Sequence, residues 1–472
     1  MKTITTLPPS TQKVRRDVVG GKRGDGHERD RRIHRPDPGR IVEGAPDPRL
    51  TARGGLVAFG TFLRRADVDR ELRDISFRLK SGPLVVYPME AQLRLLIDAN
   101  VAGEGRVFGL ESLAADPLFV HLAGGVVPSI DTVYRDLCRF DARALCDLEM
   151  LVGRQALALP GLRRHDAVHL DVDTTVEPTF GEQQEGALPG PNPRFHGRPS
   201  YHPIGGYVGE IDAFVGVRLR PGNTSFGNDD VPYVRALIAR VREELRREQR
   251  LYVRMDAAGD CTDLLAAIVE EKALFVIKPH LTKDLLAAIR AVPDAHWTTV
   301  DADAEGRPTR QVAEVHFARG TWRERGIFPR VIAVRIRDDQ DSSGRQLYLW
   351  PDLDWTVKAY LSNDITAELD DIARRYEGRA GIEPRLGELK NGFGIGKIPT
   401  GRFDANHAML LLKVLAYNLL RRFVEAVAPA LRSWHVSWLR RALICVPARL
   451  VRSARRWALR LPPDSWLLHL RC

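Results

Sequence analysis

The order of predicted elements between residues 165 and 278 constrains the fold more than any other feature of the sequence. It begins with a strand over 168–173, and a Pro/Gly-rich loop then leads to two strands that form a hairpin around Asp212. The series continues with a charged amphipathic helix over 230–249, a buried strand over 251–255, a helix over 258–272 and a strand over 274–278. Strands that alternate with helices in this way build a sheet covered by helices, so we expect an α/β fold.

Three strands, a helix, a strand, a helix and a strand are the order of a ribonuclease-H-like core. A β-rich pattern follows, with strands expected over 312–318, 330–337 and 346–350, and helical periodicity resumes after about Asp364. Such a block inside an α/β fold indicates a β-rich insertion. The sequence therefore predicts six segments: a flexible arm (1–53), an N-terminal helical domain (54–160), the first part of the core (161–278), the insertion (279–355), the second part of the core with a motif helix (356–425), and a basic helical C-terminus (426–472).

Composition excludes several classes of protein. Apolar residues make up 44% and charged residues 28% of the 472, which is ordinary globular usage. The five cysteines form no C-x-x-C pair, so neither a disulfide framework nor a thiolate zinc site is expected. The longest apolar stretch, 408–420, is interrupted by Lys413 and too short to span a bilayer, and the N-terminus has no apolar signal segment. We expect a cytoplasmic protein with no membrane partner and, because no phosphate-binding G-x-x-x-x-G-K-[ST] loop is present, no nucleotide cofactor.

The positive charge is concentrated at the C-terminal end of the chain. Of the formal net charge of +10, residues 385–472 hold 16 Lys and Arg against four acids, a net +12, which leaves −2 for the rest. The stretch is also apolar and rich in Trp, which indicates folded helices rather than a charged tail. One interpretation is an amphipathic helix pair whose Arg stems cover apolar surface. The other is a surface that contacts the phosphates of a nucleic acid.

The N-terminal helical domain contains a candidate helix-turn-helix. Helices are expected over 90–100 and 110–122, and after Gly124 and Gly125 a helix over 130–140 would begin behind Ser129 as its cap. Exposed polar side chains of this last helix would reach DNA; these are Tyr134, Arg135 and Arg139. The alternative is a helical hairpin that binds nothing.

Two carboxylates lie where neighbouring strands of the predicted core end. Asp173 ends the first strand and is followed by Thr174, and Asp256 ends the fourth. Because these strands are adjacent in the predicted topology, their side chains can converge at one edge of the sheet. Aspartate is also common at solvated strand ends. Clustered carboxylates, however, repel one another unless a cation neutralises them, so a divalent-metal site is the functional interpretation.

A third carboxylate belongs to a spaced motif. Tyr376, Arg379, Glu383 and Lys390 have offsets of 3, 7 and 14, which place them on one face of a helix. Glu383 can complete a three-carboxylate site for two metal ions about 3.5–4 Å apart, the arrangement used in phosphodiester hydrolysis. Arg379 and Lys390 can hold the flanking phosphates, and Tyr376 can donate a hydrogen bond to one. The alternative is a surface helix with ordinary i,i+4 ion pairs.

With these residues the chain resembles the insertion-sequence DDE transposases, in particular the group with a Tyr-Arg-Glu-Lys motif helix and a β-rich insertion between the second Asp and the Glu. The resemblance covers about 80–472 and rests on the segments 170–175, 220–224, 253–256, 388–394 and the motif itself. It implies a catalytic triad of Asp173, Asp256 and Glu383 that binds Mg²⁺, or Mn²⁺ in its place. Asp171 is the rival for the first position; Asp173 is preferred because the catalytic Asp of this family is directly followed by Ser or Thr.

The resemblance also implies what the protein binds. Its partners would be double-stranded DNA, as terminal inverted repeats and target DNA, and a second copy of the chain. A flipped base could stack on an aromatic side chain of the insertion, either Trp297 or Trp322, although both would equally suit core packing. The resemblance predicts a bacterial DNA transposase; the alternatives are a ribonuclease-H-like nuclease without strand transfer and an inactive DNA-binding derivative.

One residue, Pro384, is expected to interrupt the helix that carries the motif. Pro384 directly follows Glu383, and proline inside a helix removes a hydrogen bond. We expect either a kink at this point or a new helix with Pro384 at its first position.

Overall fold

The computed structural model describes Pro38 and residues 41–469, except 182, 193–194, 338–354 and 398. From Pro48 onward the described residues form one compact unit. Most of the predicted arm and the strand expected over 346–350 lie outside the described residues. The six segment boundaries given above stay predictions.

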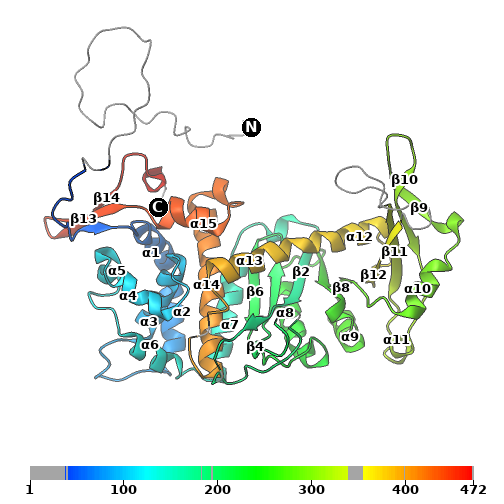
Figure 1. Cartoon of the computed structure of the whole chain (residues 1–472), viewed down its shortest axis with the longest axis horizontal. Helices are drawn as coiled ribbons and strands as arrows, with labels where there is room; N and C mark the ends of the chain where they lie inside the picture. The colour runs from blue at the N-terminus through cyan, green and yellow to red at the C-terminus, as the bar shows by residue number, and fades with distance from the viewer. Residues whose placement is uncertain are drawn as a thin grey trace, which may run out of the picture. The chain divides into compact units, whose positions relative to one another are not determined.

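A nine-stranded mixed sheet forms the centre of the described chain (Figure 1). Its strands run in the order β6 (Ala213–Arg218), β5 (Ile204–Val208), β2 (Ala167–Thr174), β7 (Arg250–Met255), β8 (Leu274–Ile277), β12 (Trp355–Ser362), β11 (Arg330–Arg337), β10 (Pro308–Glu314) and β9 (Thr298–Ala302). Strands β2, β7 and β8 are parallel, and the other pairs are antiparallel. The predicted α/β fold is confirmed, including the adjacency of the two strands that end in Asp173 and Asp256.

The sequence of β2 explains why its two faces differ. Val168, Leu170 and Val172 alternate along the strand, are fully buried, and pack beneath the helices α8 (Val231–Arg242) and α9 (Thr262–Glu270). The residues between them, among them Asp171 and Asp173, point to the opposite face because successive side chains of a strand alternate. The polar face of β2 is therefore presented to the elements that cover the other side of the sheet.

The insertion continues the sheet of the core. Strand β12, which the sequence did not predict, pairs with β8 through Leu361↔Ile277 and Ser362↔Val276, and along its length with β11. Strands β10 and β9 extend the sheet further, and β9 was likewise not predicted. Two short helices belong to the same region, α10 (Lys283–Arg290) and α11 (Gly320–Glu324). The hydrogen bonds of the core sheet thus run directly into the insertion.

The N-terminal helices pack around one long helix near the C-terminus (Figure 1). They are α1 (Leu56–Arg65), α2 (Val68–Ser76), α3 (Met89–Val101), α4 (Leu110–Leu113), α5 (Pro117–Leu122), α6 (Ile130–Leu137) and α7 (Ala142–Leu157), and the long helix is α14 (Phe403–Val427). The helix expected over 110–122 is divided in two, because Asp116 caps a new helix that has Pro117 at its first position. Ser129 caps α6 as predicted, by accepting a hydrogen bond from the Thr132 amide.

The C-terminal region departs from the predicted helical structure. After α14 and the short helix α15 (Val436–Leu439), the chain forms a hairpin of β13 (Ala448–Ser453) and β14 (Arg456–Arg460). Strand β13 also pairs with β1 (Leu50–Thr51), so residues about 400 apart share a three-stranded sheet. A further small pair joins β3 (Glu177–Pro178) to β4 (Ser200–Tyr201). None of the described helices is long and apolar enough to cross a membrane.

Candidate active site

The predicted motif spans two helices and the short turn that joins them. Tyr376 lies in the last turn of α12 (Leu369–Glu377), and Arg379 lies in a 3₁₀ turn over Gly378–Gly381. Glu383 and Lys390 lie in the first and last turns of α13 (Ile382–Gly392). The two helices run in line across the sheet in Figure 1. The irregularity predicted at Pro384 lies instead in the turn over Gly378–Gly381, three to six residues earlier in the chain.

The position of Pro384 corrects both alternatives drawn from the sequence. Helix α13 begins at Ile382, so Pro384 is its third residue. The first four N–H groups of a helix have no acceptor within it, and a proline there removes no hydrogen bond. Glu383 consequently sits in a regular first turn, where the helix dipole favours a carboxylate.

Asp173 is held where β2 ends, against the motif. Its Oδ2 forms an ion pair of 2.9 Å with Nη2 of Arg379, and its Oδ1 accepts a 2.8 Å hydrogen bond from the Thr174 amide. Both side chains are largely buried, at 15% exposed for Asp173 and 8% for Arg379. Arg379 was predicted to contact DNA phosphate; here its guanidinium is the partner of the first carboxylate.

The other two predicted ligands lie close enough to Asp173 for their charges to act on it. Burial raises the pKa of Asp173 to about 6; the Arg379 guanidinium lowers it, and the negative charges of Asp256 and Glu383 raise it. Asp256 directly follows β7, and its carboxylate accepts a hydrogen bond from the Ala258 amide. Glu383 is exposed to solvent. Three elements far apart in sequence thus bring these three carboxylates into one electrostatic neighbourhood.

The donor set suits a hard divalent cation. All three side chains offer carboxylate oxygens, the ligands preferred by Mg²⁺ and Mn²⁺, and the mutual repulsion expressed in the pKa of Asp173 is what a bound cation would relieve. Within the part of the chain that the structure describes, no three acidic, His or Cys side chains are gathered closely enough to hold an ion as they stand. Binding therefore requires the carboxylates to draw together, with Arg379 as the counter-ion already in place.

Asp171 is occupied by a different partner. Arg254 binds it through two hydrogen bonds, Nε to Oδ1 at 2.5 Å and Nη2 to Oδ2 at 2.8 Å, and Asp171 is 1% exposed. The remaining Nη1 of Arg254 donates to the carbonyl of Arg375 at the end of α12. A Cβ on Gly378 would lie 2.9 Å from this Nη1, which explains the glycine there. Arg254 was not singled out from the sequence, although it lies two residues before Asp256.

The two remaining motif residues also face the end of β2. Lys390 Nζ lies 3.3 Å from the Glu177 carboxylate and donates to the Val176 carbonyl, both just beyond Asp173. The Tyr376 ring packs on Tyr360 with centroids 4.8 Å apart. Burial raises the pKa of Tyr376, so its hydroxyl stays protonated and able to donate a hydrogen bond at neutral pH.

The other predicted DNA contacts lie away from this edge. Arg135 on α6 and Arg139, two residues beyond its end, are exposed, and Arg139 also pairs with Asp136 at 3.0 Å. Tyr134 is partly buried against the helical core. Two buried aromatic side chains of the insertion have packing partners instead: Arg335 lies over Trp297 and Arg319 over Trp322, at 4.4 and 4.7 Å. Neither ring face is open to a base as it stands.

Comparison with known proteins decides the family. The pattern of the family described as transposase DDE domain, group 1, matches residues 43–467. The chain belongs to this family of DDE transposases. Among solved structures it is similar to a piggyBac transposase in a synaptic complex with hairpin DNA, at 12% identity and a TM-score of 0.40 over 82% of this chain and 78% of that one. No curated protein matches it. The predicted family is thereby confirmed.

Proposed function

We propose that this DDE transposase cuts DNA at the ends of an insertion sequence and joins the freed ends to target DNA. The observation that carries the proposal is the convergence of Asp173, Asp256 and Glu383, where burial and then the charges of the other two carboxylates raise the pKa of Asp173. Such a surplus of negative charge is costly in a folded protein unless a cation is to be bound there.

Each part of the site has a distinct task in this proposal. Asp173, Asp256 and Glu383 would hold two Mg²⁺ ions, which supply Lewis-acid stabilisation of the charge that develops at the phosphate. Lys390 and Tyr376 lie beside the carboxylates and would hold the flanking phosphates. Arg379 would keep Asp173 ionised and oriented, and could also contact the phosphate backbone.

Two in-line displacements at phosphorus complete the reaction. In the first, water attacks the phosphodiester at the element's end, one of its protons is lost to solvent, and the 3′-oxygen leaves. In the second, the freed 3′-OH attacks a target phosphodiester and displaces its 3′-oxygen, so the number of phosphodiester bonds is conserved. Joining two ends in this way calls for a dimer on DNA, with Arg135 and Arg139 of each helical domain available for end binding.

The proposal is tested by removing one charge at a time without changing shape. Asp173→Asn, Asp256→Asn and Glu383→Gln should each lower Mg²⁺-dependent cleavage of a duplex carrying the terminal repeats by on the order of 10³-fold or more, because several kcal/mol of metal-dependent stabilisation is lost. DNA binding should persist. Asp371→Asn, on the exposed side of α12, is the matched control and should cleave normally.

The products separate a transposase from a simple nuclease. The wild-type chain should yield joined target molecules as well as cut ends, and a gel of the reaction with a circular target would show both. Cut ends without joined products would leave only nuclease activity, and full cleavage by any of the three site variants would remove that residue from the metal site.

A further inference from the structure

The hairpin β13–β14 lies in the most strongly basic part of the chain. No acidic residue occurs between Glu425 and Asp464, whereas eight arginines do. Five of them belong to the hairpin: Arg449, Arg452, Arg455, Arg456 and Arg460. Five of the eight arginines in this acid-free stretch thus lie in one two-stranded ribbon.

The two faces of this ribbon have different surroundings. Leu450 and Leu459 pair on the inner face, and further along it Trp457 packs on His121 of α5 with ring centroids 4.9 Å apart. The other face carries arginines, because Arg449 and Arg460 are direct cross-strand partners and Arg456 follows on the same side. The outer face of the ribbon is therefore basic.

The turn at the tip adds a further exposed arginine, Arg455. Ala454 and Arg455 form a two-residue loop with φ of 46° and 67°, in the left-handed region where glycine or asparagine is usual. Arg456 and Arg460 are also exposed, and no ion pair with a described acid involves either of them or Arg455. The tip therefore presents its charges to solvent.

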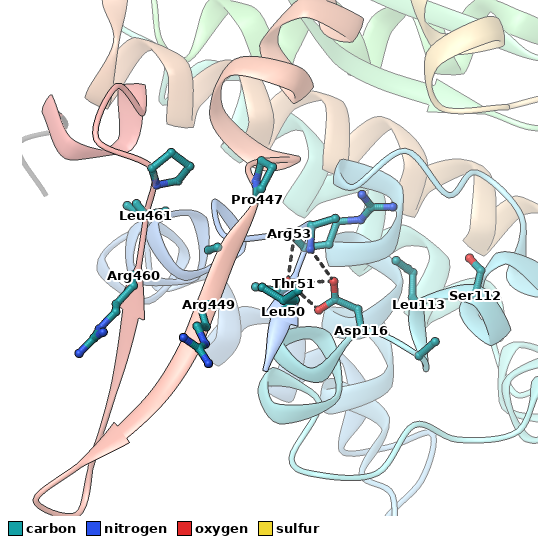
Figure 2. Close-up of a pocket in the computed structure, with 14 residues that line it drawn as sticks. Leu50, Thr51, Arg53, Ser112, Leu113, Asp116, Pro447, Arg449, Arg460 and Leu461 are labelled. Carbon is teal, nitrogen blue, oxygen red and sulfur yellow. Dashed lines mark hydrogen bonds between the residues drawn. The ribbon is translucent and has the colours of Figure 1, made fainter. Parts of the chain in front are cut away.

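A hollow lies at the root of the ribbon (Figure 2). Its volume is about 710 Å³, its walls include Leu50, Leu113 and Leu461, and Arg449 and Arg460 stand side by side at its margin in Figure 2. Asp116 is the one acid among the described residues that line it. Its oxygens accept hydrogen bonds from the Thr51 hydroxyl and from three backbone amides, so it is committed to capping α5 and β1.

We propose that the β13–β14 hairpin is a DNA-binding ribbon that enters the major groove of a duplex, with the hollow receiving the adjoining sugar-phosphate backbone. A two-stranded ribbon fits a groove about 12 Å wide, and exposed arginines are the side chains that read guanine edges and hold phosphates. The proposal rests on the proposed function and adds to it the element, the groove and the face that contact DNA.

The test compares two double variants that remove the same charge. Arg456→Gln/Arg460→Gln alters the arginine face, and Arg246→Gln/Arg247→Gln alters two exposed arginines beyond the end of α8. Fluorescence anisotropy with a duplex at several salt concentrations should show affinity about tenfold or more weaker for the hairpin variant. Its dependence of log K on log salt should be shallower by about two, because two phosphate contacts are lost. The control should match the wild type.

A variant on the inner face of the ribbon, together with footprinting, tests which face contacts DNA. Arg452→Gln, on the inner face, should change binding less than the outer-face variant, and hydroxyl-radical footprints should lose one groove-wide protected patch only in the latter. Circular dichroism confirms that the variants fold. An unchanged salt slope, with aggregation of the hairpin variant, would overturn the proposal and assign the arginines to protecting the edge strand β14.

The failure of this inference is distinguishable from failure of the proposed function. Normal cleavage and joining by a hairpin variant with wild-type DNA affinity would overturn the ribbon and leave the transposase reaction standing. Conversely, a wild-type chain that binds DNA through the hairpin but produces no cut ends would support the ribbon and contradict the reaction.

Discussion

Two clusters of charged side chains include residues of α13, and they differ in the balance of positive and negative charge. In the first, Asp212 and Glu388 are matched by Arg385 and Arg421: Arg421 Nη2 lies 2.6 Å and Arg385 Nη1 2.9 Å from the Glu388 carboxylate, and Arg385 Nε lies 2.7 Å from Asp212. In the second, Arg379 pairs with Asp173, and among the described residues neither Asp256 nor Glu383 has an ion pair. We call these the balanced network and the acidic edge.

The difference shows how a structural cluster and a catalytic one can be told apart. Buried ions persist in folded proteins when each charge has a partner, and the balanced network meets that condition with two acids and two arginines. The acidic edge does not meet that condition, and burial, together with the charges of Asp256 and Glu383, raises the pKa of Asp173 there. Helix α13 thus contributes Glu388 to a network in which each charge is paired, and Glu383 to a cluster in which negative charge exceeds positive charge.

Breaking the balanced network should give the largest loss of stability. Glu388→Gln leaves Arg421 and Arg385 buried with one acid between them, and we expect the free energy of unfolding to fall by about 3–5 kcal/mol in urea denaturation. Glu383→Gln, on the same helix but exposed, should change it by less than about 0.5 kcal/mol. Equal losses in the two variants would contradict the distinction drawn here.

Adding a cation should stabilise the acidic edge and leave the balanced network unaffected. Mg²⁺ at about 100 times its dissociation constant should raise the free energy of unfolding by about 2.7 kcal/mol through mass action, and chelation should reverse the gain. Asp173→Asn should abolish this response, whereas Asp371→Asn should retain it. Thermal melts with and without metal measure both; a metal response that survives in Asp173→Asn would place the ion elsewhere.

Alkaline pH should weaken the balanced network. Tyr207 donates a 2.8 Å hydrogen bond to Asp212, and burial together with the Asp212 charge raises the pKa of Tyr207 well above its usual value. The contribution to stability is complete below pH about 10, where the unfolded tyrosine is still neutral, and falls by about 1.4 kcal/mol per pH unit above it. Tyr207→Phe should flatten that fall in unfolding measurements between pH 9 and 11; an unchanged slope would exclude Tyr207 as its source.

The core and the carboxylates could be predicted because their signals are local. The alternation of Val168, Leu170 and Val172 fixes which side chains of β2 are buried, and the parallel pairing with β7 then brings Asp173 near Asp256. The preference for Asp173 over Asp171 agrees with the geometry, since Arg254 occupies Asp171. That arginine's role depends on three elements meeting in space, which no local pattern contains. The catalytic roles themselves stay predictions.

The C-terminal hairpin could not be predicted because its turn carries no turn residue. Ala454 and Arg455 adopt positive φ without glycine or asparagine, and the flanking run of Arg, Leu and Trp resembles an amphipathic helix. Pairing with β1, close to 400 residues earlier, favours the strands over the helix. Strand β12 was missed similarly, since much of its stability comes from pairing with β11 rather than from its own sequence.

The seam between core and insertion has a mechanical consequence. Strand β12 pairs with β11 through eight residue pairs, but with β8 through only two, Leu361↔Ile277 and Ser362↔Val276. A load applied to the insertion, such as the pull of a bent duplex, would act on those two residue pairs and on the Asn363 side chain, which accepts from the Phe275 amide and donates to the Ala273 carbonyl. The insertion is therefore joined to the core sheet over a short length. Any rotation of the insertion relative to the core would be centred near Leu361 and Ser362.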